Sequence, residues 1–246
     1  MYEVDQSRLI SREVLLSILK ATQTDQTIGF DELAELSRTP RSLVQTYIEK
    51  LAAKDSVSIV DGVICTDDEQ RIAIAVEALK DGADPERVCR KLNWKEFEEV
   101  TLIALDSNGY DSKRHFIFKQ RGKRWEIDIV GVKGRLVLCV DCKHWTYGWQ
   151  RSRITTAVQQ QIVRTKALAD EISNHIKRLR LSDRTEFTFV PILVTLADVC
   201  SRNIMNVPIV PVLRMRSFLD GLSDQVSPPF LSFVGNATRI TSYLDP

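Results

Sequence analysis

The chain has 246 residues, of which 43% are hydrophobic and 27% are charged, and its formal net charge is +1. This composition is typical of a globular protein with a sizeable core, and the length allows one large domain or two smaller ones. No apolar run approaches the roughly 18 residues of a membrane span, and the five cysteines are scattered and odd in number. The first residues lack the layout of a signal peptide. We therefore expect a cytoplasmic protein with no membrane partner and no disulfide framework.

Charge is distributed unevenly along the chain. Residues 113–180 contain 16 Lys or Arg and 5 Asp or Glu, whereas residues 1–112 contain 13 and 22. A basic block of this kind is typical of a protein that binds the phosphate backbone of nucleic acids. The alternative is a solvated face whose acidic partners come from other segments.

The first 66 residues predict three short helices and a hairpin. Apolar residues recur at helical spacing in residues 10–19, and a proline precedes a further helix over residues 41–54. Asp61 and Gly62 separate two β-branched runs, which is the composition of a tight hairpin turn. This order resembles a winged helix, whose third helix reads DNA. Because residues 1–66 carry 7 basic and 10 acidic side chains, a protein-contact role, such as homodimerisation, is an equal alternative.

Residues 67–92 predict a helical connector. Its apolar stripe includes Ile72 and Leu79, and it breaks at Gly82. A second domain is expected over residues 93–246.

The second domain predicts a mixed α/β fold with alternating helical and strand patterns. The expected elements are a helix (93–110), three strands (114–120, 124–132, 135–145), a long helix (155–179) and two strands (186–195, 207–213). The order is αβββαββ.

Acidic side chains converge on two neighbouring strands of this domain. Side chains alternate between faces, so that Asp141 shares a face with Lys143, and Glu126 shares a face with Asp128. A turn between the two strands makes them a hairpin and brings the carboxylates together. A divalent cation such as Mg²⁺ or Mn²⁺ would relieve their repulsion. Without metal, the repulsion predicts that Asp141→Asn is neutral or stabilising.

These residues resemble the PD-(D/E)xK nuclease superfamily, which has a restriction endonuclease-like αβββαβ core with a mixed sheet. The superfamily motif is an acid on the second strand followed by D/E-x-K on the third, and it matches Asp128 and the run Asp141, Cys142, Lys143. The resemblance covers roughly residues 93–215.

Within the superfamily, the pattern is most similar to Mrr-type restriction endonucleases and archaeal Holliday junction resolvases. The matching pieces are Phe97-Glu98 on the first helix, Gly109-Tyr110 after it, and Lys143-His144-Trp145.

The resemblance implies a role for each matched residue. Asp128 and Asp141 would bind the metal ion, with the main-chain carbonyl of Cys142 as a third oxygen. Lys143 would position the attacking water and stabilise charge on the phosphate. Glu98 would complete the site from the first helix.

Two further assignments stay open between neighbouring residues. Glu96 and Glu99 compete with Glu98 for the place in the site, and all three could instead form a solvated acidic face. Some relatives place a glutamine of the following helix on the metal-bound water or the scissile phosphate; we favour Gln161 of residues 159–161, against ordinary helix surface.

Other candidate chemistry finds less support. Cys139 and Cys142 lie three apart on a strand and therefore on opposite faces, which argues against zinc or redox chemistry and favours core thiols. His144 has no partner that spacing identifies. Trp145, Tyr147 and Trp149 alternate among basic residues, and they could stack on bases or cap the sheet edge.

The sequence therefore predicts a metal-dependent nuclease, a hydrolase that cuts phosphodiester bonds in duplex, single-stranded or branched DNA. The rival is a non-catalytic nucleic-acid-binding or assembly protein with a nuclease-like fold, and a third option is RNA as the substrate.

Overall fold

The computed structural model describes residues 6–144, 151–181, 186–196, 203–222 and 230–237. It divides into two compact units, Met1–Phe97 and Glu98–Pro246, and the division falls inside helix α6 (Trp94–Ser107). The sequence predicts a boundary at residue 93, just before this helix begins. Across the described ranges, no helix is long and apolar enough to cross a membrane.

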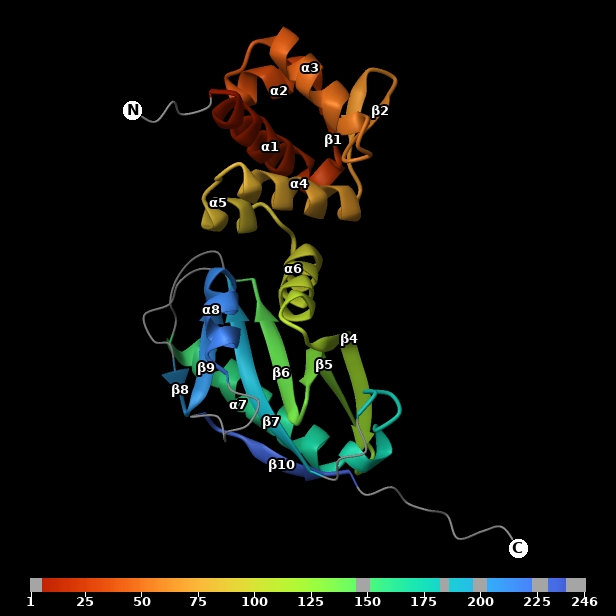
Figure 1. The fold of residues 1–246 in the computed structure, drawn as a ribbon, viewed down its shortest axis with the longest axis vertical. Coiled ribbons are helices and arrows are strands. Elements are labelled where there is room, and N and C mark those ends of the chain that lie inside the picture. Colours follow the sequence, from red (N-terminus) through yellow and green to blue (C-terminus); the bar gives the residue numbers. More distant parts are fainter. Residues whose placement is uncertain (1–5, 145–150, 182–185, 197–202, 223–229, 238–246) are drawn as a thin grey trace, which may run out of the picture. The chain divides into compact units, whose positions relative to one another are not determined.

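The first unit combines helices with a small antiparallel sheet (Figure 1). Its helices are α1 (Gln6–Asp25), α2 (Phe30–Ser37), α3 (Arg41–Ala52), α4 (Asp68–Lys80) and α5 (Pro85–Cys89). Its strands, β1 (Thr27–Gly29), β2 (Ser58–Val60) and β3 (Val63–Cys65), have the order β1-β3-β2. The hairpin of β2 and β3 turns at Asp61 and Gly62, whose φ angles of 50° and 75° lie in the left-handed region that these residue types tolerate best. The predicted helices and hairpin are therefore present.

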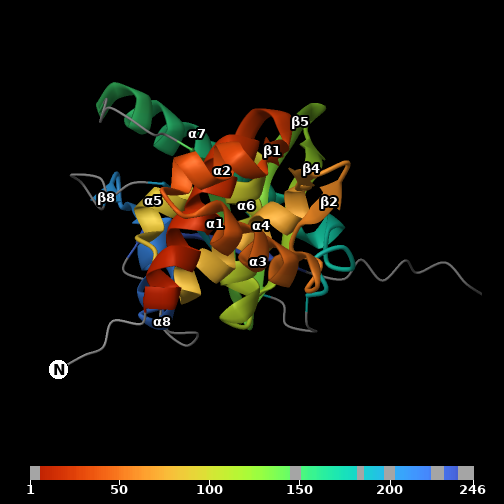
Figure 2. The same ribbon diagram turned by 90° about the horizontal axis from the view of Figure 1, so that it is seen from above.

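Helix α4 belongs to the first unit and packs against α1 (Figure 2). Its buried face matches the predicted apolar stripe only in part, because Ala75 of that stripe is buried while Ile72 and Val76 are half-buried. Leu79 is 36% exposed, whereas Arg71 and Ile74 are buried. The reason is that the Arg71 guanidinium forms an ion pair with the carboxylate of Glu96, which is also buried. The buried face of α4 therefore includes a charged residue beside Ile74 and Ala75.

The second unit is a mixed α/β structure with a mixed sheet, as the sequence predicts. After α6, its elements are β4 (Asp111–Gln120), β5 (Lys123–Lys133), β6 (Leu136–Lys143), α7 (Arg151–Asp170), β7 (Glu186–Thr195), β8 (Asn203–Ile204), β9 (Val207–Pro211), α8 (Met215–Asp220) and β10 (Phe233–Asn236). Within the described residues, the sheet order is β4-β5-β6-β7-β9-β8, with β10 beside β7. The pairs β4–β5 and β5–β6 are antiparallel, and β6–β7 and β7–β9 are parallel.

Helix α7 lies along the sheet, and the apolar side chains between the helix and the sheet form the main hydrophobic core of the second unit (Figure 1). The first half of the helix packs on β7 and β9 through Ile154 and Val158, and the second half packs on β5, β6 and β7 through Ala167 and Leu168. The sequence predicts that this helix runs to residue 179, but it ends at Asp170 because the following chain turns to bury Ile172 in the same core.

Candidate functional site

The two predicted metal ligands lie where strands β5 and β6 separate. Pairing between these strands ends at Ile129 and Val140, and Asp128 and Asp141 are the next residues on the two strands. Strand β6 stays paired with β7 as far as Lys143. The carboxylates therefore stand at a fork in the sheet, on the end of β6 that leads into α7.

The carboxylate of Asp141 is held between two cations. The side chain is 2% exposed; its Oδ2 lies 2.7 Å from Lys143 Nζ, and its Oδ1 accepts a hydrogen bond of 2.8 Å from Arg164. Lys143 and Arg164 each keep 27% of their side chains exposed, so both cations face solvent on one side. Because Asp141→Asn would leave two cations without their partner, we now expect this substitution to destabilise the protein without metal, which corrects the expectation from the sequence.

Asp128 lies beside this cluster and feels its charge. Its Oδ2 accepts a hydrogen bond of 2.8 Å from the main-chain N–H of Cys142. Burial and the negative charge of Asp141 raise the pKa of Asp128, while the Cys142 N–H, Lys143 and Arg164 oppose the rise. The predicted repulsion between the two aspartates is therefore present in the folded protein.

Helix α6 resolves the competition among its three glutamates. Glu96 forms the buried ion pair with Arg71, and Glu99 forms a partly exposed ion pair with Arg114. Glu98 is 5% exposed, and its carboxylate interacts with Asp128. Burial first, and then the charge of Asp128, raise the pKa of Glu98 to about 7. Of the three, Glu98 is thus the one whose carboxylate feels the charge of Asp128.

His115 joins the site from β4, and the sequence patterns did not identify it. Its φ of 48° is left-handed, and this residue interrupts the regular pairing of β4 with β5. The imidazole lies 3.7 Å from Glu98 and 3.4 Å from Glu126. Glu126 is 47% exposed and therefore lies at the margin of the site. No short sequence motif identifies His115 as a site residue, because the residue reaches the carboxylates through the bend in β4.

Helix α7 contributes Arg164 to the site, whereas Gln161 packs the helix onto the sheet. Gln161 is fully buried and donates a hydrogen bond of 2.7 Å to the carbonyl of Cys139. The structure does not bring Gln161 to the carboxylates. Arg164 lies one helical turn further on the same side and contacts Asp141. No local pattern marks Arg164, because its contact with Asp141 depends on how α7 packs on the sheet.

The two cysteines of β6 point to opposite faces of the sheet, as predicted. Cys139 lies near Thr165 of α7, and Cys142 lies near Thr101 of α6. Burial raises the pKa of Cys139 to about 12 and raises that of Cys142 well above its ordinary value. Protonated thiols of this kind are poor metal ligands and poor nucleophiles.

The side chains present fit a hard divalent cation held by few protein ligands. Among the described residues, no group of three or more His, Cys, Asp or Glu side chains surrounds a common metal position. Mg²⁺ is commonly held by one or two carboxylates, and water and substrate phosphate complete its shell. Two repelling carboxylates at the fork supply that number. The predicted third oxygen, the carbonyl of Cys142, belongs to the peptide next to Asp141, and Glu98 adds a further carboxylate nearby.

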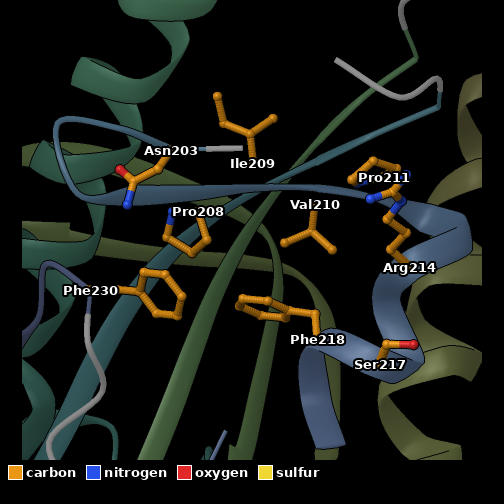
Figure 3. Close-up of a pocket in the computed structure, with 9 residues that line it drawn as sticks. All are labelled: Asn203, Pro208, Ile209, Val210, Pro211, Arg214, Ser217, Phe218 and Phe230. Carbon is orange, nitrogen blue, oxygen red and sulfur yellow. The ribbon is translucent and has the colours of Figure 1, made fainter. Parts of the chain in front are cut away.

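A separate pocket of about 590 Å³ opens beside β9 and α8 (Figure 3). Phe218 and Phe230 lie in it with ring centroids 5.7 Å apart, and Arg214 stands at one end. The remaining lining is mostly the prolines and aliphatic side chains of β9. Among its described lining residues the pocket contains no carboxylate, and Ser217 supplies its hydroxyl group. Trp145, Tyr147 and Trp149, which the sequence suggested as base-stacking residues, lie outside the described residues.

Comparison with known proteins adds relatives without an assigned activity. No protein-family model matches the sequence. A protein of Archaeoglobus fulgidus that is named only as an uncharacterized protein is 30% identical over 132 residues, which are 53% of this chain and 92% of that protein. Among solved structures, protein VC1899 from Vibrio cholerae aligns at 13% identity with a TM-score of 0.37. The alignment covers 89% of this chain and 55% of VC1899, so this chain spans about half the length of that protein.

Proposed function

We propose that this chain, which belongs to the same family as the Archaeoglobus fulgidus protein, is a metal-dependent nuclease that hydrolyses phosphodiester bonds in DNA. The observation that carries the proposal is the cluster of Asp128, Asp141 and Lys143 at the fork of the sheet, with Glu98 facing it. The element order α6-β4-β5-β6-α7-β7 supports a restriction endonuclease-like core. Clusters of acids with perturbed pKa values beside a lysine are typical of functional sites.

Each residue of the cluster has a chemical task in this proposal. Asp128 and Asp141 would hold Mg²⁺ or Mn²⁺, which when bound would polarise the phosphate. Lys143 would break its ion pair with Asp141 and orient the attacking water. It would also donate a hydrogen bond to the phosphate oxygen on which negative charge develops. Arg164 would keep Asp141 in place through its 2.8 Å hydrogen bond while Lys143 moves. Glu98 would add a carboxylate from α6.

The choice of nucleic acid as substrate rests on charge. The block of residues 113–180, with 16 basic and 5 acidic side chains, includes β4, β5, β6 and α7, the elements that form the fork. Such a field attracts a polyanion and raises its local concentration. The choice of DNA and not RNA as the substrate is part of the proposal, and the cleavage assay below tests it.

The first unit supports a protein contact better than DNA reading. Arg41 lies 2.7 Å from Asp31, and Lys54 lies 3.2 Å from Glu77, so two basic residues of the candidate recognition helix already face acids. Residues 41–54 contain three basic side chains, and of these only Lys50 has no acid within ion-pair distance among the described residues. A winged helix that contacts a partner chain, such as a second copy, is the assignment we propose for this unit.

The proposal is tested by cleavage of circular duplex, linear duplex, single-stranded and four-way-junction DNA, and of RNA, with Mg²⁺ or Mn²⁺. Lys143→Ala is expected to slow cleavage by about 10² to 10³-fold, the usual cost of removing one donor to a developing charge. Lys166→Ala, an exposed lysine on α7, is the matched control and should cut at the wild-type rate. Equal rates for Lys143→Ala and wild type would refute the mechanism.

One observation favours the rival function. Because Lys143 and Arg164 already neutralise Asp141, the cluster could be a salt-bridge network in a non-catalytic nucleic-acid-binding or assembly protein. This rival predicts binding of DNA without cleavage under any metal condition. It also predicts that Lys143→Ala changes stability alone.

A further inference from the structure

The hairpin of β4 and β5 extends past the fork as a two-stranded ribbon. Pairing between β5 and β6 ends at Ile129. Beyond this point β4 and β5 stay paired with each other, from Phe116 opposite Ile127 to Gln120 opposite Lys123. One face of the ribbon packs on the core through Phe116 and Trp125. The far end carries four exposed basic residues, which we call the basic tip. They are Lys119, Arg121, Lys123 and Arg124.

The basic tip departs from two local rules of hairpin stability. Lys119 and Arg124 are direct cross-strand partners, and like charges in that arrangement destabilise a sheet. Arg121 occupies the first turn position with a φ of 48°, where Asn, Asp or Gly is strongly preferred, and Gly122 follows with a φ of 78°. Such departures are expected at functional sites, where something other than stability selects the residue.

No described residue forms an ion pair with the basic tip. Across the described ranges, no acidic side chain lies within ion-pair distance of any of its four residues. Lys123 instead lies over the ring of Trp125, 3.7 Å from its centroid. The nearby segment 176–180 adds Arg178, which is exposed, lies over Phe116 and donates to the carbonyl of Ile117. Lys123 and Arg178 are therefore fixed on aromatic rings, and Asp170, an acid beside the ribbon, accepts a hydrogen bond from Gln120 and forms no ion pair with the basic tip.

We propose that the basic tip binds the phosphate backbone of duplex DNA on one side of the bond that the fork cleaves. The inference rests on the proposed function for its choice of partner. Arg124 lies four residues along β5 from Asp128, which is at most about 14 Å at a strand rise of about 3.4 Å per residue. That reach corresponds to about four base pairs of duplex. Contacts from side chains of this kind hold the duplex in register and do not read its sequence.

The test is the salt dependence of duplex binding in chelator, where no cleavage occurs. The tip variant carries Lys119→Gln, Arg121→Asn and Arg124→Gln. The control variant carries Lys20→Gln, Lys50→Gln and Lys166→Gln, three exposed lysines elsewhere, and its net charge falls by the same amount. Fluorescence anisotropy of a labelled duplex between about 50 and 200 mM salt gives the slope of log K against log salt.

The tip variant is expected to reduce the steepness of this negative slope by about 2 to 3, at about 0.9 for each phosphate that the tip no longer neutralises, and the control by less than about 1. Equal slopes for the two variants would show that the effect depends on net charge and not on the position of the cations, which would overturn the proposal. A tip variant that binds like wild type would overturn it as well. A slope change on duplex RNA with no measurable DNA binding would overturn the choice of DNA.

Stability separates weakened binding from impaired folding. Because the substitutions relieve the Lys119–Arg124 repulsion and place Asn in a left-handed turn position, the tip variant should melt at or above the wild-type temperature. If it melts lower, the single variant Arg124→Gln, which relieves the same repulsion, carries the test with a slope change of about 1. Failure of the nuclease proposal shows separately, as absence of cleavage by the wild-type protein or as an equal cleavage rate for Lys143→Ala, while binding in chelator stays measurable.

Discussion

Glu98 offers the sharpest test of the electrostatics of the fork. Its carboxyl is 5% exposed and faces Asp128, and burial and that charge raise its pKa from the ordinary value of 4.5 to about 7. Glu98→Gln keeps the shape of the side chain and removes its charge. Without metal, the substitution should therefore remove a cost that the folded protein bears only when Glu98 is ionised.

The size and sign of that cost follow from the pKa shift. Between pH 4.5 and about 7, the folded state binds a proton that the unfolded state has released, so stability falls as pH rises through this window and is level above it. At about 1.4 kcal/mol per unit, the full cost is about 3 kcal/mol. Glu98→Gln should thus be neutral near pH 4 and more stable than wild type by up to about 3 kcal/mol near pH 8.

Urea unfolding in chelator across this pH range measures the difference between wild type and variant. Glu99→Gln is the matched control, because Glu99 lies next in the chain and pairs with Arg114 at the surface. Its difference from wild type should not grow with pH in the same way. A Glu98→Gln difference that is constant with pH, or that favours wild type at high pH, would show that Glu98 does not face the aspartates as an ionised, buried carboxylate.

Three further outcomes are expected. Glu96→Gln removes the charged partner of buried Arg71 and should cost about 3 to 5 kcal/mol in urea unfolding of the first unit, whereas Glu99→Gln should cost about 1 kcal/mol or less; similar costs would contradict the assignment of the two glutamates. Replacing Arg41 and Lys50 with glutamate should change duplex-DNA affinity by less than about threefold in anisotropy, and a loss of about tenfold or more would assign DNA reading to α3. Cys139 should resist alkylation by iodoacetamide in the folded protein and react on unfolding, because burial raises its thiol pKa; rapid labelling of Cys139 in the folded protein would place it at the surface.

Local patterns predict most of the elements of this chain. Alternating apolar residues and turn pairs such as Asp61-Gly62 act within a few positions, so the hairpins lie where the sequence indicates them. The face of α4 could not be predicted in the same way. An arginine enters the core there only because Glu96, 25 residues later in the chain, meets it. Apolar periodicity carries no information on such a pair.

The candidate site likewise contains residues that local sequence patterns could predict and residues that they could not. Strand alternation and the hairpin between β5 and β6 are local, and they were sufficient to place Asp128, Asp141 and Lys143 together. Arg164 and His115 come from elements whose approach depends on how α7 packs and how β4 bends. Their contacts with the acids are tertiary, so a sequence without structure could not single them out from the other basic residues of the block.

The central claim, that the carboxylates at the fork hold a divalent cation, is tested most directly by the melting temperature with and without Mg²⁺ or Mn²⁺. Asp128→Asn is the decisive variant, because its amide oxygen can still accept the hydrogen bond from Cys142 while the repelling charge is gone. In chelator, this variant should melt at or above the wild-type temperature. A hundredfold excess of metal over its dissociation constant should stabilise wild type by about 2.7 kcal/mol, and Asp128→Asn should forfeit most of that gain. An identical response of the two proteins to the metal, or no response in wild type, would contradict the metal site.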